Sequence, residues 1–274
     1  MRSSPIVIAV LLLAACKGQS APEQAATTAA PSQAAPVASA SEAASSATSA
    51  GSAMAVSEKN DLYEFDYAWP AAAGGIPALK AWLEGDLAAQ KAKLIEGAKA
   101  WQTETKKGGF PYHAYAHSTK WQVVTDLPGW LSLSAQRWEY TGGAHGNPFF
   151  GALLWDKAAD KRRAALDLFT SPAALSAAIR GPFCDALDRQ REKRRGGTIK
   201  RDSGDPFSEC LDPVKSVLIL GSSDKAHFTR IGVLVGPYEA GPYAEGNYEV
   251  TVPVTDAVLK VVRPEYRTAF AAGR

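Results

Sequence analysis

The sequence lacks the short motifs by which several enzyme classes are recognised. It contains no Gly-x-Ser-x-Gly elbow, no His-Glu-x-x-His pair, no Walker-type or dinucleotide-binding glycine loop and no Cys-x-x-Cys pair. These absences exclude the hydrolases, zinc proteases, nucleotide-dependent enzymes and dithiol oxidoreductases that carry those motifs. We therefore expect no cofactor.

Histidine is scarce, with four copies in 274 residues. His113 and His117 are four residues apart, which would suit a metal site on a helix. Pro111 and Tyr115 favour a strand there instead, and four residues along a strand separate the two rings by about 13 Å. We therefore expect no metal site.

The chain also lacks an excess of either charge. Thirty Lys and Arg residues face 28 Asp and Glu residues, for a formal net charge of +2. This balance gives no basic footprint for nucleic acid, and we expect no nucleic-acid partner. The one basic run, 189–195, is interpreted as a solvated helix end, where cations are favoured by the helix dipole.

The first fifteen residues have the features of an export signal. Arg2 is followed by an apolar run, 6–13, that is too short to span a bilayer. Leu-Ala-Ala-Cys16 then resembles the bacterial lipobox, in which the leader is cleaved before the cysteine and the cysteine carries the lipid. The alternative is a plain secretory leader with a chance cysteine. We predict a lipoprotein signal peptide over 1–15 and lipidation at Cys16.

Residues 16–57 consist almost entirely of Ala, Ser, Thr, Pro and Gln. Such a composition cannot offset the entropy of ordering, so it predicts a disordered tether. Lys17 stands where the inner-membrane retention signal of many lipoproteins has an aspartate. We therefore expect a lipid anchor in the cell envelope, on the periplasmic side of the outer membrane.

After Cys16 only Cys184 and Cys210 remain. In an exported protein an isolated pair favours one disulfide, and two buried thiols are the alternative. The bond would close the basic, glycine-containing segment 191–209 and stabilise the fold by roughly 3 kcal/mol.

From residue 62 onward the apolar pattern alternates between the strand and the helix periods. A strand over 62–69 precedes a long amphipathic helix from Pro77 to Trp101, in which Trp101 belongs to the buried stripe. Strands follow, then a second helix after Ser171, whose inner face is marked by Leu175, Ile179, Phe183 and Leu187. A strand-rich third ends the chain. This order predicts an α+β protein, with two small antiparallel-sheet units that each pack a helix.

The segment Tyr140-Thr-Gly-Gly-Ala-His-Gly-Asn147 joins two of the predicted strands. Its glycines permit positive φ and a close backbone approach, so His145 can be held at a strand end with room beside it. The alternative is a wide hairpin connection whose histidine bonds locally.

A second glycine-rich segment, 236–246, places Tyr238 and Tyr243 between two strands. Tyrosines on a loop stiffened by Gly and Pro offer amphipathic contact area at low entropic cost, which suits binding. The alternative is a long structured connection whose tyrosines pack on the sheet.

Together the two segments resemble the extracytoplasmic region of the anti-sigma factor RsiV, and the first half resembles the accessory domain of PdaC-type peptidoglycan deacetylases. The resemblance covers about residues 60 to 262. Val254 departs from it, since the family usually has an aromatic there. The residues that carry it are Tyr140, Gly142, Gly143, Ala144, His145 and Gly146, then Tyr238, Tyr243, Ala244, Gly246 and Pro253.

The resemblance implies a PdaC-like accessory domain over 58–147 and an RsiV-like C-terminal domain over 148–262. It also implies an envelope-facing binding role, because RsiV is a receptor for lysozyme. The sequence shows neither a sigma-binding segment nor a deacetylase metal motif, so signalling through cleavage and deacetylation are not expected. The candidate binding residues are Tyr140, Gly142, Gly143, His145, Gly146, Tyr238 and Tyr243.

Our hypothesis is a lipid-anchored, non-catalytic envelope protein that binds peptidoglycan or a lysozyme-like hydrolase. One alternative is a cell-wall hydrolase that uses His145 with a carboxylate among Glu139, Asp156 and Glu245. The other is a structural lipoprotein without a dedicated ligand.

Overall fold

The computed structural model describes residues 52–273, which belong to one compact unit. The predicted leader, the lipidation site Cys16 and the tether up to residue 51 lie outside the described residues. The folded part begins earlier than expected, because Met54–Lys59 forms the strand β1. Residues 54–57 of this strand fall in the predicted tether, yet the strand pairs along its whole length with the next one.

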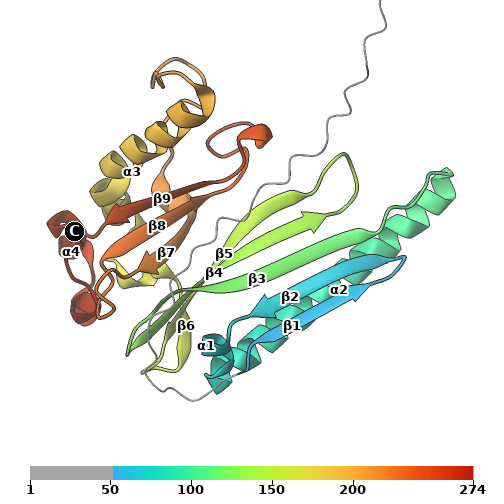
Figure 1. The fold of residues 1–274 in the computed structure, drawn as a ribbon, viewed down its shortest axis with the longest axis horizontal. Coiled ribbons are helices and arrows are strands. Elements are labelled where there is room, and N and C mark those ends of the chain that lie inside the picture. Colours follow the sequence, from blue (N-terminus) through green and yellow to red (C-terminus); the bar gives the residue numbers. More distant parts are fainter. Residues whose placement is uncertain (1–51, 274) are drawn as a thin grey trace, which may run out of the picture. The chain divides into compact units, whose positions relative to one another are not determined.

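A six-stranded sheet forms the first half of the fold, with its strands in sequence order (Figure 1). All neighbouring pairs are antiparallel except β2 and β3, which are parallel. We expected antiparallel sheets, but the chain between these two strands is a long helix that returns it to the starting end. The strands are β1 Met54–Lys59, β2 Tyr63–Trp69, β3 Tyr115–Asp126, β4 Trp130–Tyr140, β5 Asn147–Asp156 and β6 Lys161–Arg163.

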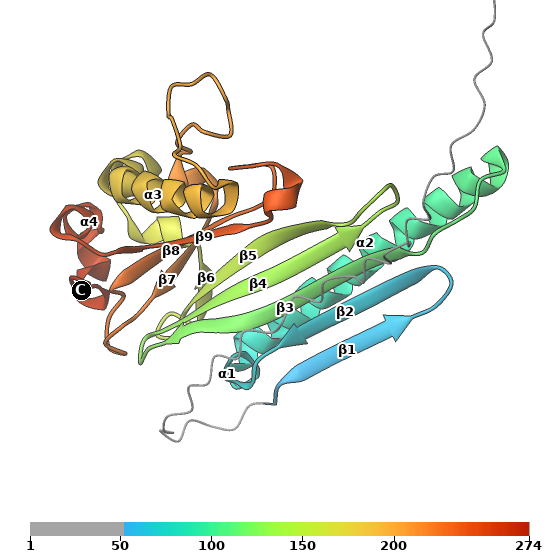
Figure 2. The same cartoon turned by 45° about the horizontal axis from the view of Figure 1, so that its top comes forward.

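The returning helix is α2, Pro77–Gly108, which follows the short α1, Ala71–Gly74. It begins with a proline in the first turn, where the missing N–H costs nothing, and ends at Gly109 in the left-handed region with φ 71°. Its buried side chains include Leu79, Leu83 and Leu94. They belong to one apolar core with side chains of the sheet. Figure 2 shows α2 lying along one face of that sheet.

The second half contains a three-stranded antiparallel sheet covered by α3, Pro172–Arg195. Ser171 caps this helix by accepting from the N–H of Ala174, and the expected inner face is buried. The α+β class is thus confirmed. The remaining elements are η1 Ala165–Leu168, η2 Pro213–Lys215, β7 Val217–Gly221, β8 Arg230–Val235, η3 Tyr243–Glu245, β9 Tyr248–Pro253, α4 Asp256–Val261 and η4 Pro264–Ala269.

The two halves share packing. Leu127 and Leu154 of the first half belong to the apolar core around α3, and Trp130 packs against that core. The boundary expected at 147/148 falls where β5 begins, so residues 148–163 complete the first sheet with two strands.

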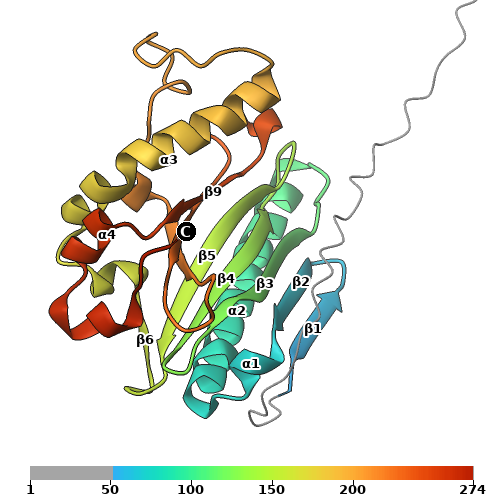
Figure 3. The ribbon, with the colours of Figure 1, turned by 60° about the vertical axis from the view of Figure 1, so that its left-hand side comes forward.

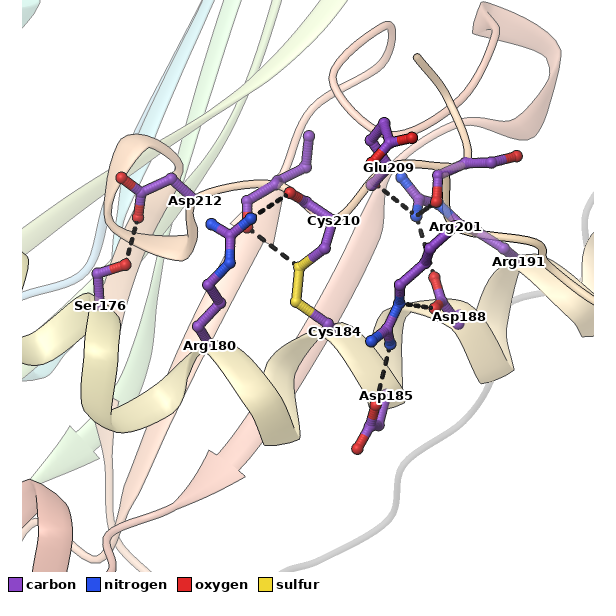
Figure 4. The surroundings of a disulfide bond; sticks show 12 residues. Ser176, Arg180, Cys184, Asp185, Asp188, Arg191, Arg201, Glu209, Cys210 and Asp212 are labelled. Atoms are coloured by element: carbon purple, nitrogen blue, oxygen red, sulfur yellow. Dashed lines mark hydrogen bonds and ion pairs between the residues drawn. A yellow bond between two sulfur atoms is a disulfide. The ribbon is translucent and has the colours of Figure 1, made fainter. Parts of the chain in front are cut away.

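The expected disulfide between Cys184 and Cys210 is present, with 5.5 Å between the Cα atoms (Figure 4). It ties α3 to the far end of the segment 196–209. Among the described residues no helix combines the length and the apolar character that crossing a membrane requires.

A candidate binding surface

The connection between β4 and β5 is a tight hairpin tip in which glycine is required. Gly142 and Gly143 have φ of 94° and 92°, and the hydroxyl of Tyr140 donates to the carbonyl of Gly143 at 3.1 Å. Gly146 is buried against the Trp138 ring, where an added Cβ would lie 2.2 Å from a ring carbon. The tip can therefore adopt this shape only with glycine at these positions.

The loop between β8 and β9, residues 236–247, forms the second part of the surface. Tyr238 sits at φ 67°, a conformation rare for a side chain this large, and its N–H donates to the carbonyl of Gly241 at 3.1 Å. Tyr238 as a whole is 55% exposed. The loop thus presents a tyrosine to solvent at a strained backbone position, a combination found at functional sites.

The hairpin tip and the loop meet. The His145 ring stacks on the Tyr243 ring with 4.0 Å between centroids, and the Tyr243 hydroxyl donates to the carbonyl of Gly146 at 2.8 Å. Tyr238 follows at 5.7 Å from Tyr243. Figure 3 shows the two segments side by side. The two segments thus lie together, although 97 residues separate Gly146 from Tyr243.

We call the group formed by the exposed Trp138, His145 and Tyr238 and the half-buried Tyr140 and Tyr243 the aromatic surface. Trp138 is 37% exposed and stacks with Tyr140. Trp101 of α2 lies beside the tip, with its ring nitrogen 3.6 Å from where a Cβ on Gly142 would be. Trp101 was expected in the core, but it is 42% exposed because it lies in the last two turns of α2.

Three arginines of α3 hold the loop from below. Arg191 is fully buried and its Nε donates to the carbonyl of Ala240 at 3.0 Å, while Nη1 donates to the carbonyl of Glu209 and to Asp188, each at 3.0 Å. This side chain joins the loop to the segment that the disulfide closes (Figure 4).

Arg194 and Arg195 complete the support. Arg195 donates to both carboxylate oxygens of Glu245, at 2.8 and 2.9 Å, and to the carbonyl of Ala240. Arg194 lies over the Tyr248 ring at 3.8 Å and donates to the carbonyl of Asn247. The interpretation of 189–195 as a solvated helix end is therefore wrong for Arg191 and Arg195, which are buried and half-buried against loop carbonyls, while Arg194 remains exposed.

These contacts set the electrostatics of the loop. Burial alone would raise the pKa of Glu245, but Arg195 and the Tyr248 hydroxyl stabilise its charged form and hold the pKa below its usual value. The hydrogen bond to Glu245 in turn raises the pKa of Arg195. Glu245 is thus a structural carboxylate, because it is paired with Arg195, which supports the same loop.

His145 does not gain a carboxylate partner from the residues proposed for it. Its Nδ1 lies 3.0 Å from the carbonyl of Gly146. Glu245 is bound to Arg195, and Asp156 pairs with Arg163 at 3.3 Å. Glu139 lies opposite His117 in the β3–β4 ladder. Among residues 52–273, the hydrogen bonds of His145 therefore include none to Glu139, Asp156 or Glu245.

His113 and His117, the two histidines four residues apart, lie in different surroundings. His117 is buried under α2, where its Nε2 contacts the Gln90 side chain, and burial lowers its pKa. His113 precedes β3. No group of three His, Cys, Asp or Glu side chains suited to a metal ion occurs in the described part of the chain.

Comparison with known proteins supports the fold and one part of the expected resemblance. Residues 56–148 match the family described as Deacetylase PdaC, a stretch that includes the hairpin tip. A solved structure of a DUF3298 family member from Bacteroides fragilis has 17% identity and a TM-score of 0.52, and the match covers 79% of this chain and 94% of that one.

A second solved DUF3298 family protein, from Pseudomonas aeruginosa, has 15% identity and a TM-score of 0.44 over 82% of this chain and 98% of that one. No curated protein matches the chain. Residues 56–148 are therefore similar to the PdaC family, as expected, and the chain shares its fold with the Bacteroides protein.

Proposed function

We propose that this protein is a lipid-anchored accessory module of the cell envelope that binds the glycan of peptidoglycan on its aromatic surface, without catalysis. The observation that carries the proposal is the meeting of the hairpin tip and the 236–247 loop, stacked through His145 and Tyr243. Two glycine-rich connections with a purely structural role would not need to bring the His145 and Tyr243 rings together.

The chemistry of the surface suits a ligand that is both apolar and hydroxylated. Tyr and Trp rings supply a large apolar face together with a polar tip, and they lose little entropy on binding. The backbone beneath is held by Arg191 and Arg195. Such preorganisation raises affinity because less ordering is needed when the ligand binds.

The match over 56–148 supports the choice of partner. PdaC-type deacetylases act on peptidoglycan, and the matched stretch carries the tip with Gly142, Gly143 and His145. A lysozyme-like protein is the second candidate, favoured by the exposed Tyr238, because tyrosine is enriched at protein interfaces.

Co-sedimentation of the detergent-solubilised exported protein with purified sacculi tests the proposal. We expect Tyr238→Ala and His145→Ala to lower the bound fraction with little change in melting temperature, and to be non-additive because both rings contact Tyr243. His227→Ala is the matched control, since that histidine is exposed in the turn at the other end of β8.

Binding of sacculi that is equal in wild type and Tyr238→Ala would contradict the glycan assignment, and selective capture of a lysozyme-like protein would replace it with the second candidate. Turnover of sacculi that is abolished by His145→Ala would contradict a binding-only role. Fatty-acid labelling that is lost in Cys16→Ser tests the anchor.

A further inference from the structure

Beside the aromatic surface lies a cleft of about 370 Å³ on the face of the first sheet that α2 leaves open. Its volume is within the range of small-ligand sites, about 300 to 1,000 Å³. Trp138 belongs to both features, and Asn247 closes the cleft from the end of the 236–247 loop. The cleft is therefore continuous with the surface described above.

The floor of the cleft is two rows of side chains that cross three strands. Ser118, Trp138 and Pro148 stand opposite one another in β3, β4 and β5, and Lys120, Gln136 and Phe150 form the next row. Side chains in such register have Cβ atoms about 5 Å apart on one face. The β3 edge of the floor is polar, and the β5 edge is apolar.

Arg137 of the cleft lining pairs with Asp86 at 3.6 Å, but other polar side chains of the cleft have no internal partner within the described range 52–273. Lys120 forms no ion pair there, and neither Gln136 nor Ser118 forms a side-chain hydrogen bond. The Asn247 side-chain oxygen is removed from solvent and likewise has no hydrogen-bond partner among these residues. Because that oxygen has no contact with solvent, the polar side chains that a ligand in the cleft can reach are Ser118, Lys120 and Gln136.

We propose that the cleft binds one sugar unit that carries both an acetamido group and a carboxylate, which deepens and rests on the proposed glycan binding. The apolar face of the sugar ring packs on Trp138. The acetamido oxygen accepts from the Gln136 amide. The carboxylate pairs with Lys120, and no acidic side chain lines the cleft to oppose it.

Isothermal titration of the solubilised exported protein with a soluble disaccharide–tetrapeptide of peptidoglycan, and with chitotetraose, tests the inference. Chitotetraose has acetamido groups but no carboxylate. We expect Gln136→Ala to weaken both ligands about tenfold, the loss of a single hydrogen bond. Lys120→Gln should weaken only the peptidoglycan fragment, by about threefold to fivefold, since the ion pair is partly solvated.

Gln122→Ala is the matched control, because Gln122 follows Lys120 on the same face of β3 outside the cleft. Wild-type affinity of Gln136→Ala for both ligands would overturn the cleft assignment. If Tyr238→Ala still lowered sacculus binding, the proposed function would survive that result. Absence of any binding by wild type to sacculi and to both soluble ligands would overturn both proposals.

Discussion

Gly146 shows how much a single residue contributes to the candidate surface. An alanine Cβ would lie 2.2 Å from the Trp138 ring, so the ring or the hairpin tip must move. We expect Gly146→Ala to cost about 2 kcal/mol of stability, in the range of overpacking, and to weaken glycan binding. Thermal unfolding and sacculus co-sedimentation measure the two effects.

Gly85→Ala is the matched control for this change. Gly85 lies inside α2, and a Cβ there would have no atom within 4 Å. Replacing glycine in a helix interior stabilises by about 0.5 to 1 kcal/mol, so the control is expected to shift in the opposite direction. A wild-type melting temperature for Gly146→Ala would show that Trp138 moves freely and does not define the tip.

Glu245 gives the loop a dependence on pH. Its folded-state pKa lies below the ordinary glutamate value, so its contribution is complete above that value and is lost as the pH falls through the lowered pKa. We expect the difference in unfolding free energy between wild type and Glu245→Gln to be about 2 kcal/mol at neutral pH and to vanish in acid. Urea unfolding from pH 7 downward measures it.

The exposed Glu249 of β9 provides the comparison, because its side chain forms no ion pair in the described part of the chain. Glu249→Gln is expected to change the unfolding free energy little at any of these pH values. A difference for Glu245→Gln that persisted at low pH would mean that the charge of Glu245 does not stabilise the loop.

The turn character of the hairpin tip and of the 236–247 loop could be predicted from the sequence, because glycine and tyrosine indicate such segments locally. The side chains that each segment contacts could not be predicted. Trp138 was simply a strand residue in the sequence, and its contact with Gly146 depends on how the tip folds back over β4. Asn247 had no local signal at all, since its unpaired oxygen becomes visible only when the loop is placed over the cleft.

At the scale of elements, the end of α3 supports the loop through Arg191. Arg191→Met keeps the length of the side chain but leaves the carbonyl of Glu209 without its donor and the carbonyl of Ala240 with Arg195 alone. We expect a loss of about 3 kcal/mol, as for other broken buried charge networks. We also expect the Tyr238→Ala effect on sacculus binding to shrink in this background, because the loop is no longer held.

Arg189→Met tests whether the position, and not the charge, matters. Arg189 belongs to the same basic run but is exposed. Chemical denaturation of the two variants compares them directly. An equal loss of stability in both variants would mean that the whole run 189–195 acts as a solvated helix end.

The disulfide closes the segment from α3 to Cys210 with a sequence separation of 26 (Figure 4). Replacing both Cys184 and Cys210 with alanine is expected to cost about 3 kcal/mol, and proteolysis within 196–209 should become faster. Arg201 retains its ion pairs to Asp185 and Asp188, so the segment keeps some attachment to α3. Quantitative alkylation of native protein without reductant would refute the bond.

The helices were predictable from their 3.6-residue period and their caps, such as Pro77 and Ser171. Which arginines of the basic run 189–195 are buried could not be predicted. Arg189 and Arg191 look alike in sequence and differ only in the face of α3 that they occupy. Burial of Arg191 depends on the carbonyl of Ala240, which is 49 residues away in the sequence. Local sequence carries no such information.

At the scale of the molecule, the α+β class followed from the order of elements, while the parallel pairing of β2 with β3 did not. Strand patterns show which face is buried, but they do not show the direction in which a strand pairs. The position of β1 was missed for a related reason: an edge strand with one weakly buried face resembles the polar tether before it.

The boundary predicted at 147/148 gives the last test. A fragment 52–147 would lack β5, which pairs with β4 along its length and buries Leu153, Leu154 and Trp155. Each buried side chain of this kind contributes about 2 kcal/mol, so the loss is about 6 kcal/mol, comparable to the whole stability of a small domain. We therefore expect this fragment to remain unfolded by circular dichroism.

The matching fragment 52–170 restores β5 and β6 but exposes Leu127 and Leu154, which pack in the core of the second half. We expect it to gain secondary structure and to melt below the full-length protein, which should unfold in one transition because the halves share that core. Two separate transitions in the full-length protein, or a cooperatively folded 52–147, would establish two independent domains. The PdaC-like stretch would then be a folding unit by itself, and the aromatic surface would be an interface between domains that can part.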